Sequence, residues 1–160
     1  MPESTTETID VPTAQAMADL GRRLAATLRA GDLLVLTGPL GAGKTALVQG
    51  IGDGLGVRGP ITSPTFVIAR VHPSLHGGPA LVHADAYRLG GVAEIDDLDL
   101  DSSTASSVTA VEWGEGLAEG LSDDRLEIVI ELHGEGRTVR LTGIGPRWAA
   151  DHPRRAGLLP

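Results

Sequence analysis

The amino-acid sequence predicts an α/β sandwich with a mostly parallel central sheet, helices on both faces and an antiparallel hairpin at the C-terminal end. Three observations support this fold class. Short apolar runs alternate with amphipathic segments in the first half of the chain. The glycine-rich stretch GPLGAGKT connects one such run to a helical pattern. Two alternating segments that flank HGEG are typical of a hairpin with a glycine turn.

The composition indicates a single small domain. The chain has 160 residues, 41% of them hydrophobic, and carries a net charge of −8. It contains no cysteine, which excludes disulfides, cysteine-bound zinc and thiol catalysis. The negative charge argues against a broad nucleic-acid footprint, which needs a basic surface. Neither a secretory signal nor an apolar run of about 18 residues is visible, so we expect a soluble cytoplasmic protein without a membrane span.

We expect three regions along the chain. Residues 1–8 are predicted to form a flexible, acidic arm, with a short strand at Ile9–Val11. Residues 9–143 are predicted to form the folded domain. Residues 144–160 contain three prolines and no clear periodicity, which predicts weak order.

The first helix is predicted between an N-cap at Thr13 and a C-cap at Gly31. Its apolar face is spaced at three and four residues and comprises Met17, Leu20, Leu24 and Leu28. The apolar run Leu33–Thr37 then predicts a strand that is buried on both faces. A second helix should follow the glycine loop, with Leu47, Val48, Ile51 and Leu55 on one side.

Further strands are predicted at Thr65–Val71, Ala80–Asp85 and Val108–Glu112. Short helices are predicted at Glu94–Leu100 and Gly114–Leu121, and a polar loop over Asp101–Ser107. The closing hairpin comprises RLEIVIEL and RTVRLT.

The loop GPLGAGKT matches the phosphate-binding pattern of P-loop NTPases, through Gly38, Gly43, Lys44 and Thr45. Small residues allow successive backbone N–H groups to surround a phosphate at a helix N-terminus. Lys44 is the only lysine of the chain, beside twelve arginines. A compact ammonium group can reach the β- and γ-phosphates where a planar guanidinium cannot, and a hydroxyl such as that of Thr45 can ligate Mg²⁺. The alternative is a chance match in a glycine-rich chain.

Two predicted strands end in an acidic residue, Asp85 and Glu112. The carboxyl ends of parallel strands face the ligand side of an open sheet, so either carboxylate could approach Mg²⁺ or its water. Each could instead cap the following helix or turn. The histidines His72, His76, His133 and His152 lack metal-ligand spacing and are expected on the surface. A threonine in TSPTF, Thr62–Phe66, has the position of a γ-phosphate-sensing switch residue or of an ordinary turn.

Four blocks in this order resemble the TsaE (YjeE) family, the ATPase component of bacterial tRNA threonylcarbamoyladenosine synthesis. They are GPLGAGKT, SPTF, HADAYRL and VEWGE. The first occurs in many NTPases, whereas the combination of the last two at this spacing is specific. The resemblance covers residues 9–143 and leaves the proline-rich tail outside.

The resemblance implies that ATP with Mg²⁺ is bound. The residues that would wrap the phosphates are Leu40, Gly41, Ala42, Gly43, Lys44 and Thr45. Thr45 and Glu112 would hold the metal, Asp85 would be the acid needed for hydrolysis, and Thr65 would be the switch-like threonine.

Three further site residues are implied less sharply by the resemblance. Trp113 would lie next to the nucleotide, although a core tryptophan is an equal alternative. The adenine would lie near the start of the first helix, at Thr13 or Ala14. Arg137, near the final hairpin, would also approach the nucleotide.

The resemblance also implies partners. The TsaD–TsaB pair would carry the transfer chemistry onto tRNA, and this chain would use ATP to return that pair to an active state. Contact with tRNA would then be indirect, in agreement with the negative charge, and ATP hydrolysis by the isolated chain would be weak.

The sequence leaves three alternative functions open. A small P-loop kinase would need an arginine-rich lid, and none is visible. A GTPase would commonly use Asn-Lys-x-Asp, but the chain has no asparagine and no second lysine. A nucleotide-sensing binding module would act through a partner that distinguishes nucleotide states.

Overall fold

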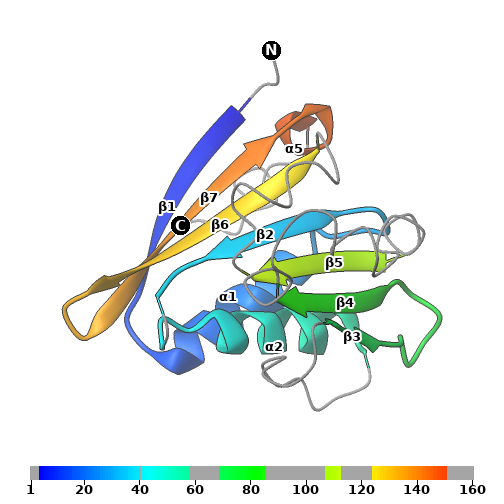
Figure 1. The fold of residues 1–160 in the computed structure, drawn as a ribbon, viewed down its shortest axis with the longest axis horizontal. Coiled ribbons are helices and arrows are strands. Elements are labelled where there is room, and N and C mark those ends of the chain that lie inside the picture. Colours follow the sequence, from blue (N-terminus) through cyan, green and yellow to red (C-terminus); the bar gives the residue numbers. More distant parts are fainter. Residues whose placement is uncertain (1–3, 40, 58–68, 86–106, 113–123, 151–160) are drawn as a thin grey trace.

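The computed structural model of the chain describes residues 4–39, 41–57, 69–85, 107–112 and 124–150. Within these residues the strands form one seven-stranded sheet, in the order β1-β7-β6-β2-β5-β4-β3 (Figure 1). The strands are β1 (Ser4–Val11), β2 (Leu33–Thr37), β3 (Ala69–His72), β4 (Ala80–Asp85), β5 (Ser107–Glu112), β6 (Arg125–His133) and β7 (Gly136–Ile144). The helices are α1 (Ala14–Ala25), α2 (Lys44–Leu55) and α5 (Pro146–Ala150).

The centre of the sheet is parallel and its margins are antiparallel. Strand β2 pairs in parallel with β5 and β6, and β4 pairs in parallel with β5. Every residue of β5 is buried, as are Leu33 to Leu36 of β2. This explains their continuous apolar sequences, because a strand covered on both faces has no solvent side. The predicted α/β class with a mostly parallel central sheet is confirmed.

The antiparallel side of the sheet is larger than predicted. The hairpin β6–β7 agrees with the prediction, and β1 adds to its outer edge from Ser4↔Ile144 to Val11↔Arg137. The expectation of a flexible arm over 1–8 is therefore wrong from Ser4 onward, and the strand is longer than Ile9–Val11. Its polar sequence STTETIDV does not show the apolar pattern that predicts a strand. An edge strand with one solvated face needs few apolar residues.

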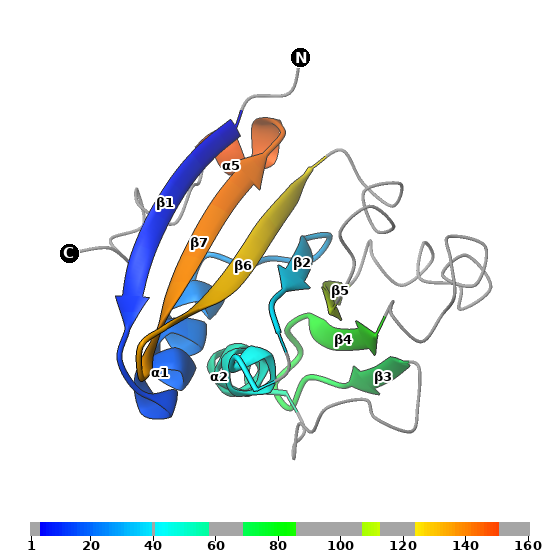
Figure 2. The same cartoon turned by 60° about the vertical axis from the view of Figure 1, so that its left-hand side comes forward.

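The helices α1 and α2 lie side by side under the curved sheet (Figure 2). Their apolar faces join alternate residues of the strands in one core. A Cβ on Gly21 would lie 2.3 Å from the Leu47 carbonyl oxygen, and one on Gly50 would lie 2.1 Å from that of Ala18. The two backbones can therefore approach this closely only with glycine at these positions.

Helix α1 begins as predicted and ends earlier. The Thr13 hydroxyl accepts a hydrogen bond from the Ala16 N–H at 3.0 Å, which is an N-cap. The helix ends at Ala25 with Ala26 as its C-cap, so the predicted C-cap at Gly31 is wrong. Gly31 instead has a φ of 96° in the turn before β2, and Leu28 packs against the core from outside the helix.

The start of the predicted weakly ordered tail is part of the folded domain. Strand β7 continues to Ile144, and α5 follows it. Trp148 is fully buried in the core, and Arg147 forms a two-point ion pair with Asp32, with both N···O distances 2.9 Å. The expectation of weak order from residue 144 is thus wrong through Ala150, because these two side chains attach the helix.

Several sequence predictions fall outside the described residues. These are the helices at Glu94–Leu100 and Gly114–Leu121, the loop from residue 101 to 106, and the first part of the strand predicted at Thr65–Val71, of which the structure describes Ala69 onward. Among the helices that are described, none has the length and apolar character needed to span a bilayer.

Candidate functional site

The glycine-rich loop connects β2 to α2 in a conformation that requires glycine. Gly41 has a φ of 78° and Gly43 one of 110°, both in the left-handed region. A Cβ on Gly38 would lie 2.8 Å from the Ile130 carbonyl oxygen of β6. Gly43 is the N-cap of α2 and has no side chain to cap it. The N-cap residue therefore offers no side-chain oxygen to the N-terminus of α2, which is the end of a helix that attracts anions.

Lys44 lies over this loop. Its side chain is buried, with 6% of the residue exposed, and Nζ donates to the carbonyl oxygens of Gly38 at 2.5 Å and Pro39 at 3.1 Å. The ammonium group is thus held at the loop, where a phosphate would meet the helix N-terminus. Thr45 is half-buried in the first turn of α2.

The two acidic strand ends are neighbours. The β4–β5 register places Asp85 opposite Glu112, and the β2–β5 register places Leu36, two residues before the loop, opposite Glu112. Both strands thus end at the edge where the glycine loop begins, as predicted for parallel strands. Glu112 is only 5% exposed.

His83 of β4 contacts Glu112 and was not singled out from the sequence. Its Nε2 lies 2.5 Å from Oε2 of Glu112, and both side chains are buried. The available signal was its position two residues before Asp85, on the same side of an alternating strand. His72 is also buried, at 7% exposure, which corrects its expected surface position, whereas His76 and His133 are exposed as expected. His152 lies outside the described residues.

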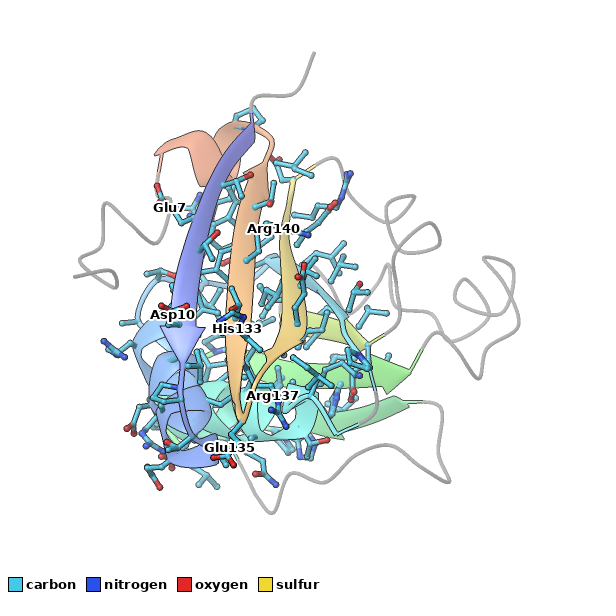
Figure 3. All side chains as sticks on the ribbon, turned by 90° about the vertical axis from the view of Figure 1, so that its left-hand side faces the viewer. Glu7, Asp10, His133, Glu135, Arg137 and Arg140 are labelled. Carbon is cyan, nitrogen blue, oxygen red and sulfur yellow. The ribbon has the colours of Figure 1, made fainter. Side chains whose placement is uncertain are left out.

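Arg137 comes to the glycine loop from the start of β7. Figure 3 shows it with Glu135 at the turn end of the β6–β7 hairpin, whereas Arg140 lies farther along the sheet. Its guanidinium donates to the carbonyl oxygens of Ala42 and Gly41, both at 3.1 Å, and to those of Gly136 and Glu135. Arg137 therefore binds the glycine loop through the carbonyl groups of the loop.

A cavity of about 110 Å³ lies between the glycine loop, the start of α1 and the β6–β7 hairpin. Its lining residues are Val11, Pro12, Thr13, Ala14, Met17, Gly41, Ala42, Gly43, Glu135 and Arg137. The structure thus brings Thr13 and Arg137 to one cavity with the glycine loop, although no sharp motif marked either residue. The cavity is lined mostly by apolar side chains and backbone, which suits a flat heterocyclic ring.

The donor set agrees with Mg²⁺ bound together with phosphates. Among the described residues, no group of three or more histidines and acidic residues could hold a metal by itself. Mg²⁺ commonly takes only one or two protein ligands beside phosphate oxygens and waters. The Thr45 hydroxyl and the Glu112 carboxylate fit that requirement.

Three of the predicted site residues, Leu40, Thr65 and Trp113, lie outside the described residues. For Asp85 the structure describes the backbone, which ends β4.

Comparison with known proteins identifies relatives of the whole domain. The family model described as "Threonylcarbamoyl adenosine biosynthesis protein TsaE" matches residues 11–139. A Streptomyces coelicolor protein named tRNA threonylcarbamoyladenosine biosynthesis protein TsaE is 62% identical over 139 residues, 83% of this chain and 94% of its own. The protein of the same name from Mycobacterium tuberculosis is 50% identical over 131 residues, 78% of each chain.

A solved structure agrees with these matches. The crystal structure of Bacillus subtilis YdiB superposes with a TM-score of 0.73 at 27% sequence identity, covering 98% of both chains. The fold is thus P-loop NTPase-like, and the chain belongs to the TsaE family.

Proposed function

We propose that this chain is a cytoplasmic, Mg²⁺-dependent ATP-binding and ATP-hydrolysing protein that supports threonylcarbamoyladenosine modification of tRNA. One observation carries the proposal. The glycine loop, which is followed directly by the buried Lys44, lines the same cavity as Thr13. One site thus offers an anion-binding helix terminus next to a mostly apolar pocket.

In this proposal the phosphates lie along residues 40–45 and the adenine occupies the cavity. The backbone N–H groups of Gly41, Gly43 and the start of α2 bind phosphate oxygens, whereas the Ala42 N–H donates to the Pro39 carbonyl oxygen. Lys44 exchanges its hydrogen bonds to Gly38 and Pro39 for the β- and γ-phosphates. Arg137 binds the carbonyl oxygen of Ala42 in the loop and also lines the cavity.

Residues at the strand ends, in the first turn of α2 and in the switch position bind Mg²⁺, orient water and sense the γ-phosphate in this proposal. Thr45 and Glu112 hold Mg²⁺, which neutralises phosphate charge when bound. Asp85 orients the attacking water, Thr65 senses the γ-phosphate, and Trp113 lies beside the nucleotide. The proposal for Asp85 is supported by its backbone position opposite Glu112.

The partners in this proposal are a TsaD–TsaB-like pair. The matched relatives are named for tRNA threonylcarbamoyladenosine biosynthesis, and the chain itself carries a net charge of −8. A strongly acidic protein does not hold RNA phosphates well. We therefore assign the tRNA contact to the partners, and to this chain the nucleotide-driven return of the pair to its active state.

Calorimetric titration of the full chain with ATP tests the first part of the proposal. ATP is expected to bind with Mg²⁺ and more weakly in EDTA, and Lys44→Ala is expected to abolish binding while its circular dichroism spectrum remains unchanged. Lys44→Arg is the matched control for charge: it is expected to bind poorly, because the wider guanidinium does not fit the slot. Unchanged ATP affinity in Lys44→Ala would contradict the proposal.

Affinity capture from the native lysate tests the second part. The full chain is expected to retain a TsaD–TsaB-like pair, and a non-hydrolysable ATP analogue is expected to change the amount retained. Hydrolysis of ATP by the isolated chain is expected to be weak and to change when the pair is added. Formation of a phosphorylated metabolite by the isolated chain would instead establish a kinase.

A further inference from the structure

The pair formed by His83 and Glu112 is a polar contact inside the core. Its N···O distance is 2.5 Å, and the two side chains are 0% and 6% exposed. In the β4–β5 register His83 lies opposite Ala110, two positions before Glu112. The contact between the Glu112 carboxylate and the imidazole therefore runs diagonally from β5 to the adjacent strand β4.

The chemistry of the contact determines which atoms are used. An ionised carboxylate only accepts hydrogen bonds, so Nε2 of His83 is the donor to Oε2 of Glu112. The contact engages Oε2, and Oε1 of the same carboxylate can serve a second ligand. In the neutral imidazole Nδ1 is then an acceptor, and it is buried without a hydrogen-bond partner among the described residues.

Stability does not explain this pair well. A buried histidine with an unpaired ring nitrogen carries a desolvation cost that an apolar side chain of similar size would avoid. Neighbouring core positions of the same two strands carry apolar residues, Leu81 on β4 and Val108 and Ala110 on β5. A histidine here is better explained by what it does to Glu112.

We propose that His83 is a positioning residue that orients the Glu112 carboxylate for Mg²⁺. The inference rests on the proposed function, in which Glu112 is a ligand of the metal. A glutamate side chain has three rotatable bonds, and a hydrogen bond to one carboxylate oxygen removes most of that freedom. Partners that hydrogen-bond a metal ligand in this way typically change metal affinity 10–100-fold when they are removed.

The test uses a matched pair of substitutions in the full chain. His83→Leu fills the space and removes the donor, whereas His83→Gln retains an N–H donor near the position of Nε2. The measurement is the affinity for a fluorescent ADP analogue, first in EDTA and then across a Mg²⁺ titration. A positioning role predicts unchanged affinity in EDTA for both variants. It predicts that half-saturation by Mg²⁺ needs about tenfold more metal in His83→Leu, with His83→Gln close to the wild type.

Controls separate this role from damage to the fold. Thr109→Val alters a buried residue of β5 on the opposite face of the sheet and should leave the Mg²⁺ dependence unchanged. Should His83→Leu fail to fold, His83→Asn takes its place, because its amide is too short to reach Glu112 and is expected to give the same loss.

Two outcomes would contradict the role of His83, and a third would contradict the proposed nucleotide-binding function on which that role rests. An Mg²⁺ dependence unchanged in His83→Leu or His83→Asn would show that His83 does not orient the ligand. Equal losses in His83→Gln and His83→Leu would show that the donor is not what matters. Failure of the wild-type chain to bind the ADP analogue at all would remove the proposed function itself.

Discussion

The guanidinium of Arg137 donates a hydrogen bond to the carbonyl oxygen of Ala42 at 3.1 Å, although the two residues are 95 positions apart. The N–H and C=O groups of a trans peptide point in opposite directions. Holding the Ala42 carbonyl group toward Arg137 therefore turns the Gly43 N–H away from Arg137. The hairpin thus fixes the orientation of this peptide group in the loop.

Arg137→Ala is expected to weaken nucleotide binding by at least about tenfold. The loop loses two hydrogen bonds from a charged group, each worth about 1.5–3 kcal/mol, and about 1.4 kcal/mol corresponds to a tenfold change in affinity. The affinity for ATP with Mg²⁺ measures this. Arg140→Ala is the matched control on the same strand, since the Arg140–Glu131 ion pair is solvent-exposed and contributes little. Equal affinities in the two variants would contradict a role of Arg137 at the loop.

Filling the cavity should separate base binding from phosphate binding. Ala14→Phe places a ring at the lining, so we expect a marked loss of ATP affinity with unchanged competition by inorganic triphosphate. Gln15→Phe, at the neighbouring exposed position outside the lining, should bind ATP normally. Parallel losses of ATP and triphosphate binding in Ala14→Phe would place the base elsewhere.

Gly50→Ala is expected to destabilise the fold by about 1–3 kcal/mol, the usual cost of overpacking a core. The added Cβ would lie 2.1 Å from the Ala18 carbonyl oxygen, so α1 and α2 would have to separate. Urea denaturation followed by circular dichroism measures the change. Asp53→Ala on the same helix removes only an exposed ion pair with Arg22 and should change stability by less than about 1 kcal/mol. Equal stability of Gly50→Ala and the wild type would show that the helices can move apart freely.

Arg147→Ala should lower the free energy of unfolding by about 3–5 kcal/mol, the range for removing one partner of a buried ion pair. The substitution leaves the Asp32 carboxylate buried, removes a hydrogen bond to the Thr27 carbonyl group and removes the guanidinium 4.4 Å from the centre of the Trp148 ring. Thermal denaturation of the full chain tests this. Arg23→Ala, at an exposed position of α1, is the control and should lie within about 0.5 kcal/mol of the wild type.

Much of the fold follows from local patterns in the chain. The continuous apolar runs of β2 and β5, the N-cap at Thr13 and the glycine turn of the β6–β7 hairpin all agree with the prediction. Each of these depends on residues within one element or turn, where periodicity and backbone preference act directly. The prediction that the strands ending in Asp85 and Glu112 finish at one edge of the sheet also agrees with the β4–β5 register, because parallel strands end at the same edge.

The glycine loop with its single lysine could be predicted from the chain alone, since left-handed φ angles and a compact ammonium group are properties of those residue types wherever the loop lies. The folded structure was needed to show that Arg137 binds that loop, that His83 contacts Glu112 and that Trp148 is buried. These contacts join residues far apart in the chain. Their energy depends on distance and burial, and no local pattern of residues encodes either quantity.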